Sequence, residues 1–234
     1  MRFLLLTVTL FCLTQLSLSQ THYIYGGFGY NFPTATNLIG SEYSNNGYDL
    51  KKGTYADGYN FQIGYSFFIL ENIGLDIYYS NLIGFRYKQY FDNGSEHDQY
   101  DNRASSITPS IIMKQDIGNF SPFLKFGASI NFITIKIGVP DFNHVYENDY
   151  SIGWSSTLGL DYKITQSVSL FIDLRLNSVT FYPNKISFYQ DGKLIAVSYP
   201  NPRLPASGGV SAMELVNAYP FSSLGLSVGV KTKL

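Results

Sequence analysis

The sequence predicts an all-β protein, an eight-stranded antiparallel up-and-down β-barrel that crosses a membrane. Apolar and polar residues alternate with a period of two along most of the chain. Most of the alternating segments are 9 to 14 residues long, whereas strands of soluble proteins average about 5 or 6 residues and membrane strands need about 9 to 11. The connections between the segments are alternately short and long, as in barrels that span a membrane.

The composition excludes several other classes of protein. The chain has 234 residues, a net charge of -1, 17% aromatic residues and only 14% charged residues, against about 25% charged in soluble domains. A disordered chain would lack the aromatics, and a nucleic-acid-binding protein would carry a basic excess. A helical membrane protein would contain apolar runs of about 18 residues and a mean hydropathy well above the observed -0.02. We therefore expect no nucleic-acid partner.

Residues 1–19 are typical of a cleaved secretory signal peptide. Arg2 supplies the positive start, an apolar stretch follows, and Ser17 to Ser19 has the small-x-small pattern of a cleavage site. A membrane anchor is the alternative, but the apolar run is too short to cross about 30 Å of hydrocarbon comfortably. The barrel domain is then expected at 20–234. The only cysteine, Cys12, is removed with the signal, so no disulfide is expected.

The alternation defines the eight strands in chain order. They are expected at His22–Tyr30, Tyr55–Phe68, Ile73–Ile83, Ala104–Gln115, Pro122–Ile137, Ser151–Tyr162, Val168–Phe181 and Phe221–Leu234. From the second strand on, the apolar faces carry Tyr59-Phe61-Ile63-Tyr65-Phe67, Ile73-Leu75-Ile77-Tyr79, Ile107-Pro109-Ile111-Met113, Leu124-Phe126-Ala128-Ile130-Phe132, Ile152-Trp154-Leu158-Leu160, Val168-Leu170-Ile172-Leu174-Leu176 and Leu224-Leu226-Val228-Val230. The opposite faces are mainly Gly, Ser, Thr and Asn, which suits a narrow interior, while the uncharged faces suit lipid.

The connections indicate the orientation of the barrel. Those at 70–72, 116–121 and 163–167 are short, and those at 31–54, 84–103, 138–150 and 182–220 are long and polar. In an antiparallel meander every second connection lies at the same end, so the short turns share one end and the long loops share the other. Bacterial outer-membrane barrels have this layout, with periplasmic turns and extracellular loops.

Aromatic residues near the strand ends predict two girdles at the membrane interfaces, where an amphipathic ring is favoured. The girdle at the turn end is expected to contain Phe67, Phe120, Phe123 and Tyr162. The girdle at the loop end is expected to contain Tyr55, Tyr59, Phe85, Tyr87, Phe132, Trp154, Phe181 and Tyr182.

Three stretches carry a resemblance to a known family: Gly74–Tyr79, Ser121–Gly127 and Ser223–Leu234. They resemble the small outer-membrane β-barrel proteins of the OmpA/OmpX-like group, and the last stretch is similar to the signal read by the barrel-assembly machinery. It departs from that signal at Thr232, which breaks the apolar run, and at Leu234, where the family usually ends in an aromatic residue. The resemblance implies the outer membrane of a Gram-negative bacterium, with lipid and lipopolysaccharide around the barrel.

Seven charged residues fall on the inward face of the strands. They are three acids and four bases: Asp76, Lys114, Lys125, Asp161, Asp173, Arg175 and Lys231. One interpretation is a salt-bridged plug, because buried charges must be paired and an eight-stranded lumen is filled by side chains. The other is a narrow, gated polar pore. We expect Asp173 or Asp161 to pair with Lys125, Arg175 or Lys231.

The sequence indicates neither catalysis nor a cofactor. Nucleophilic hydrolysis needs a Ser or Thr with a His and an acid in reach, and the His-x-Ser pattern of the family's deacylases does not occur. The loop around His97 carries Asp92, Glu96, Asp98 and Asp101, but their spacing matches no common metal motif. We expect no catalytic or metal site and keep a lipid-acting enzyme as the third alternative. A further hypothesis is that this acidic loop binds divalent ions that bridge lipopolysaccharide.

The last long loop contains the most local structure. Residues 186–199 are typical of a hairpin around Asp191-Gly192, and 211–219 of a short helix. Tyr189, Tyr199 and Tyr219 are candidate contacts for an extracellular partner, because recognition concentrates on loops above a rigid scaffold. The predicted function is a non-enzymatic surface protein of the outer membrane. The alternative is a porin-like narrow channel or passive transporter for small solutes or hydrophobic molecules.

Overall fold

The computed structural model describes residues 21–34, 37–44, 47–53, 56–84, 87–90, 96–139, 142–199 and 219–234. The predicted signal peptide and its cleavage site lie outside these residues, so they stay predictions. Within the described residues we find no helix with the length and apolar character needed to cross a membrane.

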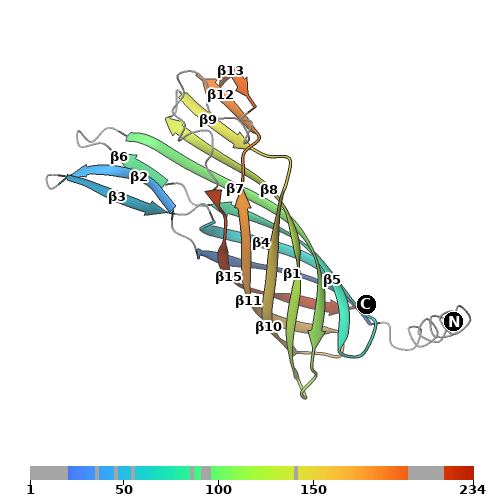
Figure 1. Ribbon diagram of the computed structural model, residues 1–234. Helices are drawn as coiled ribbons and strands as arrows, with labels where there is room; N and C mark the ends of the chain where they lie inside the picture. The colour runs from blue at the N-terminus through green and yellow to red at the C-terminus, as the bar shows by residue number, and fades with distance from the viewer. Residues whose placement is uncertain are drawn as a thin grey trace, which may run out of the picture.

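Eight long strands close into an antiparallel barrel (Figure 1). They are β1 (Thr21–Pro33), β4 (Gly58–Phe68), β5 (Ile73–Gly84), β7 (Glu96–Lys114), β8 (Phe120–Val139), β10 (Ser151–Lys163), β11 (Val168–Phe181) and β15 (Ser223–Lys233). Each strand pairs with the next, and β15 pairs with β1 from Pro33↔Ser223 to Tyr23↔Lys233, which closes the barrel. The predicted fold class and all eight predicted strands are confirmed.

The predicted long loops turn out to contain much regular β structure. A separate hairpin joins β2 (Asn37–Ser44) to β3 (Gly47–Gly53), and β6 (Tyr87–Tyr90) pairs with β7. Beyond the barrel rim, β9 (Phe142–Glu147), β12 (Lys185–Gln190) and β13 (Lys193–Ser198) continue the sheet from β8. We call these three strands the loop-end sheet. β14 (Tyr219–Pro220) pairs with the end of β11, so Tyr219 belongs to a strand and not to the predicted helix.

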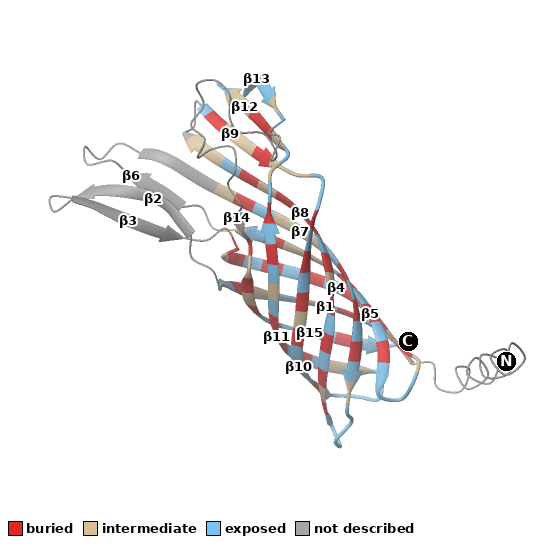
Figure 2. Ribbon diagram, viewed as in Figure 1, coloured by how far each residue is buried: buried red, intermediate tan, exposed pale blue. Residues whose placement is uncertain are grey.

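Burial alternates along the barrel strands, as the striped ribbon of Figure 2 shows. In β4 the outward Phe61 and Ile63 are 55% and 59% exposed, whereas the inward Gln62 and Ser66 are buried. The exposed belt is apolar and the buried interior is largely polar, which is the reverse of a water-soluble protein. Because a continuous apolar surface of this size causes aggregation in water, the belt fits a hydrocarbon environment.

Aromatic side chains fill part of the interior and lie against glycines. Tyr25, Phe123 and Phe171 belong to a buried cluster with Phe68, Tyr78 and Ile112. The three rings stand over glycines directly opposite them on the neighbouring strand, in the pairs Tyr25↔Gly64, Phe123↔Gly159 and Phe171↔Gly229. A Cβ atom at any of these glycines would collide with the ring, so the interior glycines make room for aromatic packing.

A second apolar cluster closes the loop end. It comprises Ala56, Leu82, Ile133, Ile135, Tyr146, Val179, Phe181, Ile186 and Phe221. Phe181 is fully buried here and Phe123 is buried in the first cluster, so their assignment to the aromatic girdles is wrong. In the alternation of side chains along their strands, both residues fall on the inward face, and a position near a strand end does not change that. Exposed Tyr59, Phe120, Phe132, Trp154, Tyr162 and Tyr182 have the outward orientation that a girdle requires.

Candidate functional site

The centre of the lumen holds a buried ion pair. The ammonium group of Lys125 lies 3.0 Å from the carboxylate of Asp76, and their side chains are 6% and 0% exposed. Lys125 also donates a hydrogen bond to the Tyr25 hydroxyl at 2.8 Å, and Asp76 accepts further hydrogen bonds from Tyr25 and Ser66. The carboxylate therefore has several donors, as a charge removed from water requires.

A second group of polar side chains connects β4 with β11. Gln62 donates to Asp173 at 3.1 Å and accepts a hydrogen bond from the guanidinium of Arg175. Asp173 and Arg175, two residues apart on the same strand, also lie within 3.7 Å of each other. The guanidinium lies 4.5 Å from the ring centre of Tyr78, whose hydroxyl shares a 2.8 Å hydrogen bond with Ser155. The planar guanidinium of Arg175 thus stacks on the Tyr78 ring, while its N–H edge donates to Gln62.

The other two inward bases lie nearer the turn end. Lys231 pairs with Asp161 at 2.5 Å. Lys114 is the most peripheral of the predicted lumen charges: it donates to the hydroxyl of Tyr23 and lies 3.6 Å from Asp116 in the turn. The structure thus joins Asp161 to Lys231 and Asp173 to Arg175, while Lys125 lies against Asp76 and not against either acid that we expected.

These contacts join strands that are not neighbours in the barrel wall. In the order β1-β4-β5-β7-β8-β10-β11-β15, the Lys125–Tyr25 hydrogen bond links β8 to β1. The stacking of Arg175 on Tyr78 links β11 to β5. Both pairs of strands are four positions apart in a ring of eight, so they lie on opposite sides. Side chains from opposite walls therefore meet inside the lumen at this level.

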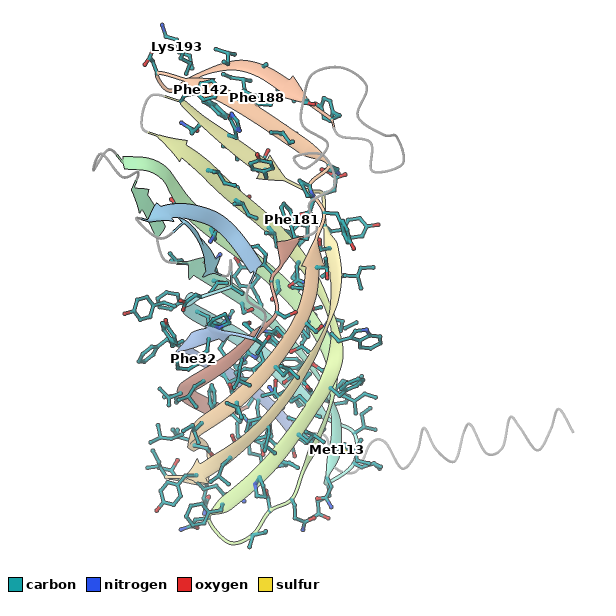
Figure 3. All side chains as sticks on the ribbon, turned by 60° about the vertical axis from the view of Figure 1, so that its left-hand side comes forward. Phe32, Met113, Phe142, Phe181, Phe188 and Lys193 are labelled. Atoms are coloured by element: carbon teal, nitrogen blue, oxygen red, sulfur yellow. The ribbon has the colours of Figure 1, made fainter. Side chains whose placement is uncertain are left out.

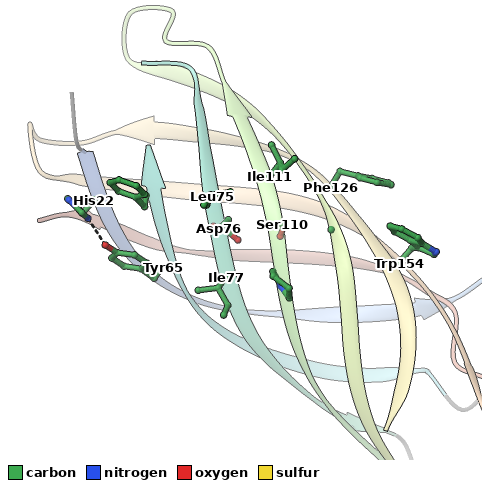
Figure 4. Close-up of a pocket in the computed structure, with 12 residues that line it drawn as sticks. His22, Tyr65, Leu75, Asp76, Ile77, Ser110, Ile111, Phe126 and Trp154 are labelled. Carbon is green, nitrogen blue, oxygen red and sulfur yellow. Dashed lines mark hydrogen bonds between the residues drawn. The ribbon is translucent and has the colours of Figure 1, made fainter. Parts of the chain in front are cut away.

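The outer wall carries a hollow of about 800 Å³ in the apolar belt (Figure 4). Phe126 and Trp154, which stack with ring centres 5.6 Å apart, form one side, and Tyr65 forms the other together with its hydrogen-bond partner His22. Pro109 lies in the hollow, where the β7–β8 ladder skips from Ile107↔Ile130 to Ser110↔Gly127. Proline has no N–H to donate to a ladder, so the β7–β8 ladder is interrupted here, while Pro109 still faces Ile77 of β5.

The structure describes the side chains of two of the three tyrosines predicted as contacts for a partner, so that surface stays a prediction. Tyr199 is 73% exposed just after β13, whereas Tyr189 is half-buried in β12. The side chain of Tyr219 lies outside the described residues. Figure 3 shows Phe142, Phe188 and Lys193 in the loop-end sheet, beyond Phe181 at the mouth of the barrel. The predicted hairpin is confirmed, because Asp191 and Gly192 have φ values of 50° and 73°, as a type I′ turn requires.

Outside the membrane-spanning strands, one turn carboxylate and one loop amine have shifted pKa values. Partial burial acts to raise the pKa of Asp116, but hydrogen bonds from Lys163 and Ser121 and the charge of Lys114 together lower it to about 2. A hydrogen bond to Glu147 raises the pKa of Lys185 in the loop-end sheet.

The described residues offer no metal site of three or more His, Cys, Asp or Glu side chains. The side chains of the acidic loop around His97 lie outside the described part, apart from Asp101. His144 packs against the rings of Phe142 and Phe188.

The comparisons with known proteins address the fold. No protein-family model and no curated protein sequence matches the chain. The structure is similar to a major outer membrane protein of Thermus thermophilus, with a TM-score of 0.63, 13% identity and coverage of 92% of this chain and 100% of that one. It is also similar to OprG of Pseudomonas aeruginosa, with a TM-score of 0.53, 12% identity and coverage of 92% of this chain and 96% of that one. Neisserial surface protein A matches with a TM-score of 0.52, 17% identity and coverage of 92% of this chain and 99% of that one. The chain thus has the fold of small outer-membrane β-barrels.

Proposed function

We propose that the protein is a non-enzymatic integral protein of the bacterial outer membrane, in which a closed barrel anchors a surface-exposed sheet. The uncharged apolar belt supports the location, because such a surface requires hydrocarbon around it. The likeness to solved outer-membrane barrels supports it independently. Membrane lipid and lipopolysaccharide are then the immediate surroundings of the belt, and the barrel-assembly machinery is the partner during insertion.

One observation carries the structural role over the channel. The Lys125–Tyr25 and Arg175–Tyr78 contacts cross the full width of the lumen. A hydrated solute passing through would have to separate a charge-assisted hydrogen bond, which contributes about 1.5–3 kcal/mol, and a buried cation–π contact, which contributes about 2 kcal/mol. The lumen charges therefore act as a plug that holds opposite walls together.

The loop-end sheet is the proposed contact surface for an extracellular partner. β13 forms the edge of the described sheet, and its Leu194, Ile195 and Val197 are 54%, 54% and 39% exposed. Exposed apolar side chains on an edge strand suit pairing with another chain. Together with Tyr199, they define the hairpin surface.

Planar-bilayer recording tests the plug. We expect purified protein to give no sustained open-channel current, and Arg175→Ala combined with Lys125→Ala to give measurable current, because both cross-lumen contacts are then lost. Lys163→Ala, which removes a partly exposed charge at the turn end of β10, is the control and should stay silent. Robust current from the unmodified protein would contradict the plug and favour the narrow channel as the function.

Binding to host or neighbouring cells tests the contact surface. Bacteria that display the protein are compared with bacteria that display Leu194→Ser/Ile195→Ser/Val197→Ser, which keeps the hairpin turn but removes its apolar side chains. We expect lower adhesion from the triple variant at equal surface abundance. Unchanged adhesion would contradict a role for the hairpin surface.

A further inference from the structure

The barrel wall opens between β10 and β11 near the loop end. Their ladder runs from Lys163↔Ser169 to Gly153↔Val179 and stops there, although β10 begins at Ser151 and β11 ends at Phe181. On their other sides both strands remain paired, since Ser151 still faces Asn131 of β8 and Phe181 still faces β14. The two strands thus separate from each other while staying in the wall.

The same two chain segments meet again above this opening. The backbone N–H of Asn184 donates to the carbonyl of Glu147 at 3.0 Å, and the β9–β12 ladder starts at Glu147↔Lys185. The opening is therefore framed below by one ladder and above by another. We call it the side window, bounded by 148–152 on one side and 180–184 on the other.

The lining of the side window combines aromatic rings with uncharged polar groups. It encloses a hollow of about 520 Å³, in which Tyr150, Trp154 and Tyr182 are 60%, 60% and 58% exposed. Asn148 and Thr180 contribute an amide and a hydroxyl. No Asp, Glu, Lys or Arg lines the hollow among the described residues. Exposed aromatic rings with polar neighbours are typical of the membrane–water interface.

Hydrogen bonding leaves a specific acceptor at the window. The side-chain amide nitrogen of Asn148 donates to Ser151 at 2.5 Å, while its carbonyl oxygen is buried without a hydrogen-bond partner in the described structure. A buried acceptor of this kind is costly unless a donor reaches it. The oxygen is covered in this structure, so a hydroxyl of a bound molecule would supply that donor after a rotation of the Asn148 amide.

The charged residues at the frame are already paired. Lys185 forms a 2.8 Å ion pair with Glu147, and Asp149 accepts a 2.9 Å hydrogen bond from Asn184. An anionic or zwitterionic head at the window would therefore find no unpaired cation among these residues to bind its phosphate. A neutral head with several hydroxyls matches the aromatic rings, the amide and the hydroxyls.

We propose that the side window binds the neutral, hydroxyl-rich head of a sugar-bearing amphiphile from the surrounding membrane leaflet, with its apolar tail along the outer belt. The Asn148 carbonyl accepts a hydrogen bond from a hydroxyl of the head, and the rings of Trp154 and Tyr182 pack against its apolar faces. This site goes beyond the proposed structural role, which requires no ligand in the wall.

Trp154 makes the test direct, because it is the only tryptophan of the chain. The protein is placed in phosphatidylcholine nanodiscs with one of two probes that carry the same brominated acyl chains, a glycosyl diacylglycerol or a phosphatidylcholine. Bromine quenches tryptophan fluorescence on contact. We expect the glycolipid to reach half-maximal quenching at a mole fraction about fivefold lower than the phosphatidylcholine probe. This ratio is the effect of one net hydrogen bond. Equal quenching by the two probes, or stronger quenching by the phosphatidylcholine probe, would overturn the proposal.

Two variants connect the preference to the window. Asn148→Ala removes the acceptor, and Thr180→Val removes an exposed hydroxyl with little change of shape. Each should lower the preference for the glycolipid severalfold, and the mobility of unboiled protein on gels checks that both are folded. Asn81→Ala is the matched control, since Asn81 lies on β5 and bonds to Ser105 away from the window. Unchanged preference in both window variants, or an equal loss in the Asn81 control, would refute the assignment.

Discussion

Replacing Lys125 by methionine tests how much the ion pair in the lumen contributes to stability. Methionine keeps the length of the apolar stem but removes the charge. The substitution leaves Asp76, whose side chain is 0% exposed, without its cation at 3.0 Å. Removing one partner of a buried pair costs about 3–5 kcal/mol. Because Tyr25 and Ser66 still donate to the carboxylate, we expect the free energy of unfolding to fall by about 3 kcal/mol, the lower end of that range.

The double variant Lys125→Met/Asp76→Asn separates the interaction from the substitution. Asparagine removes the buried charge that the first change leaves unpaired. We expect the double variant to lose at least about 2 kcal/mol less than the sum of the two single variants, as coupled residues in one network do. The measurement is urea-induced unfolding in lipid vesicles, followed by tryptophan fluorescence.

Lys114→Met provides a matched control. Lys114 is the peripheral base, and its partner Asp116 keeps a 2.9 Å ion pair with Lys163. We expect a loss of about 1 kcal/mol or less, since the partner remains paired and is partly solvated. A loss below about 1 kcal/mol for Lys125→Met, or additive losses in the double variant, would refute the buried-pair argument.

Three further results are expected. Gly159→Leu should destabilise the barrel by about 1–3 kcal/mol in the same unfolding assay, because the new side chain displaces the ring of Phe123; equal stability would contradict this packing. The pKa of Asp116 is lowered to about 2, so its contribution is complete above the unfolded pKa of about 3.9 and is lost as pH falls toward 2. Because this side chain is 45% exposed, solvent screening limits its contribution to stability to about 1 kcal/mol. When stability is measured as a function of pH, Asp116→Asn should therefore remove only the part of the decrease that occurs at acidic pH. Gly192→Val places a β-branched residue at φ 73° and should increase hydrogen exchange in the β12–β13 hairpin without changing barrel unfolding; full protection of the hairpin amides would contradict the turn assignment.

Much of the barrel follows from local information. Alternation is a property of each strand by itself, so the pattern around Phe61, Gln62 and Ile63 already separates the outward face from the inward face. The turn at Asp191-Gly192 is equally local, because only a few residue pairs tolerate two positive φ values. Parity also identifies the inward charges, although it does not reveal their partners.

The errors have two sources, one within single strands and one between segments. Distance from a strand end assigns Phe123 and Phe181 to the girdles, but their parity directs them inward. The long connections are expected to be loops, yet β7, β8, β9 and β12 extend the sheet past the rim. Backbone groups there find partners on other segments, and the local sequence does not show which segments will be adjacent.

By itself, the sequence determined the strand count, the two faces of the wall and the end at which the long connections lie, because each depends on short-range alternation and chain direction. Only the tertiary structure decided that Lys125 meets Asp76, that aromatic rings lie over facing glycines and that β10 separates from β11 above Gly153. These features depend on the register and closure of the barrel, which bring together residues far apart in the chain, such as Tyr25 and Lys125, which are 100 positions apart. Register accumulates around the whole ring, so no single strand contains the information that sets it.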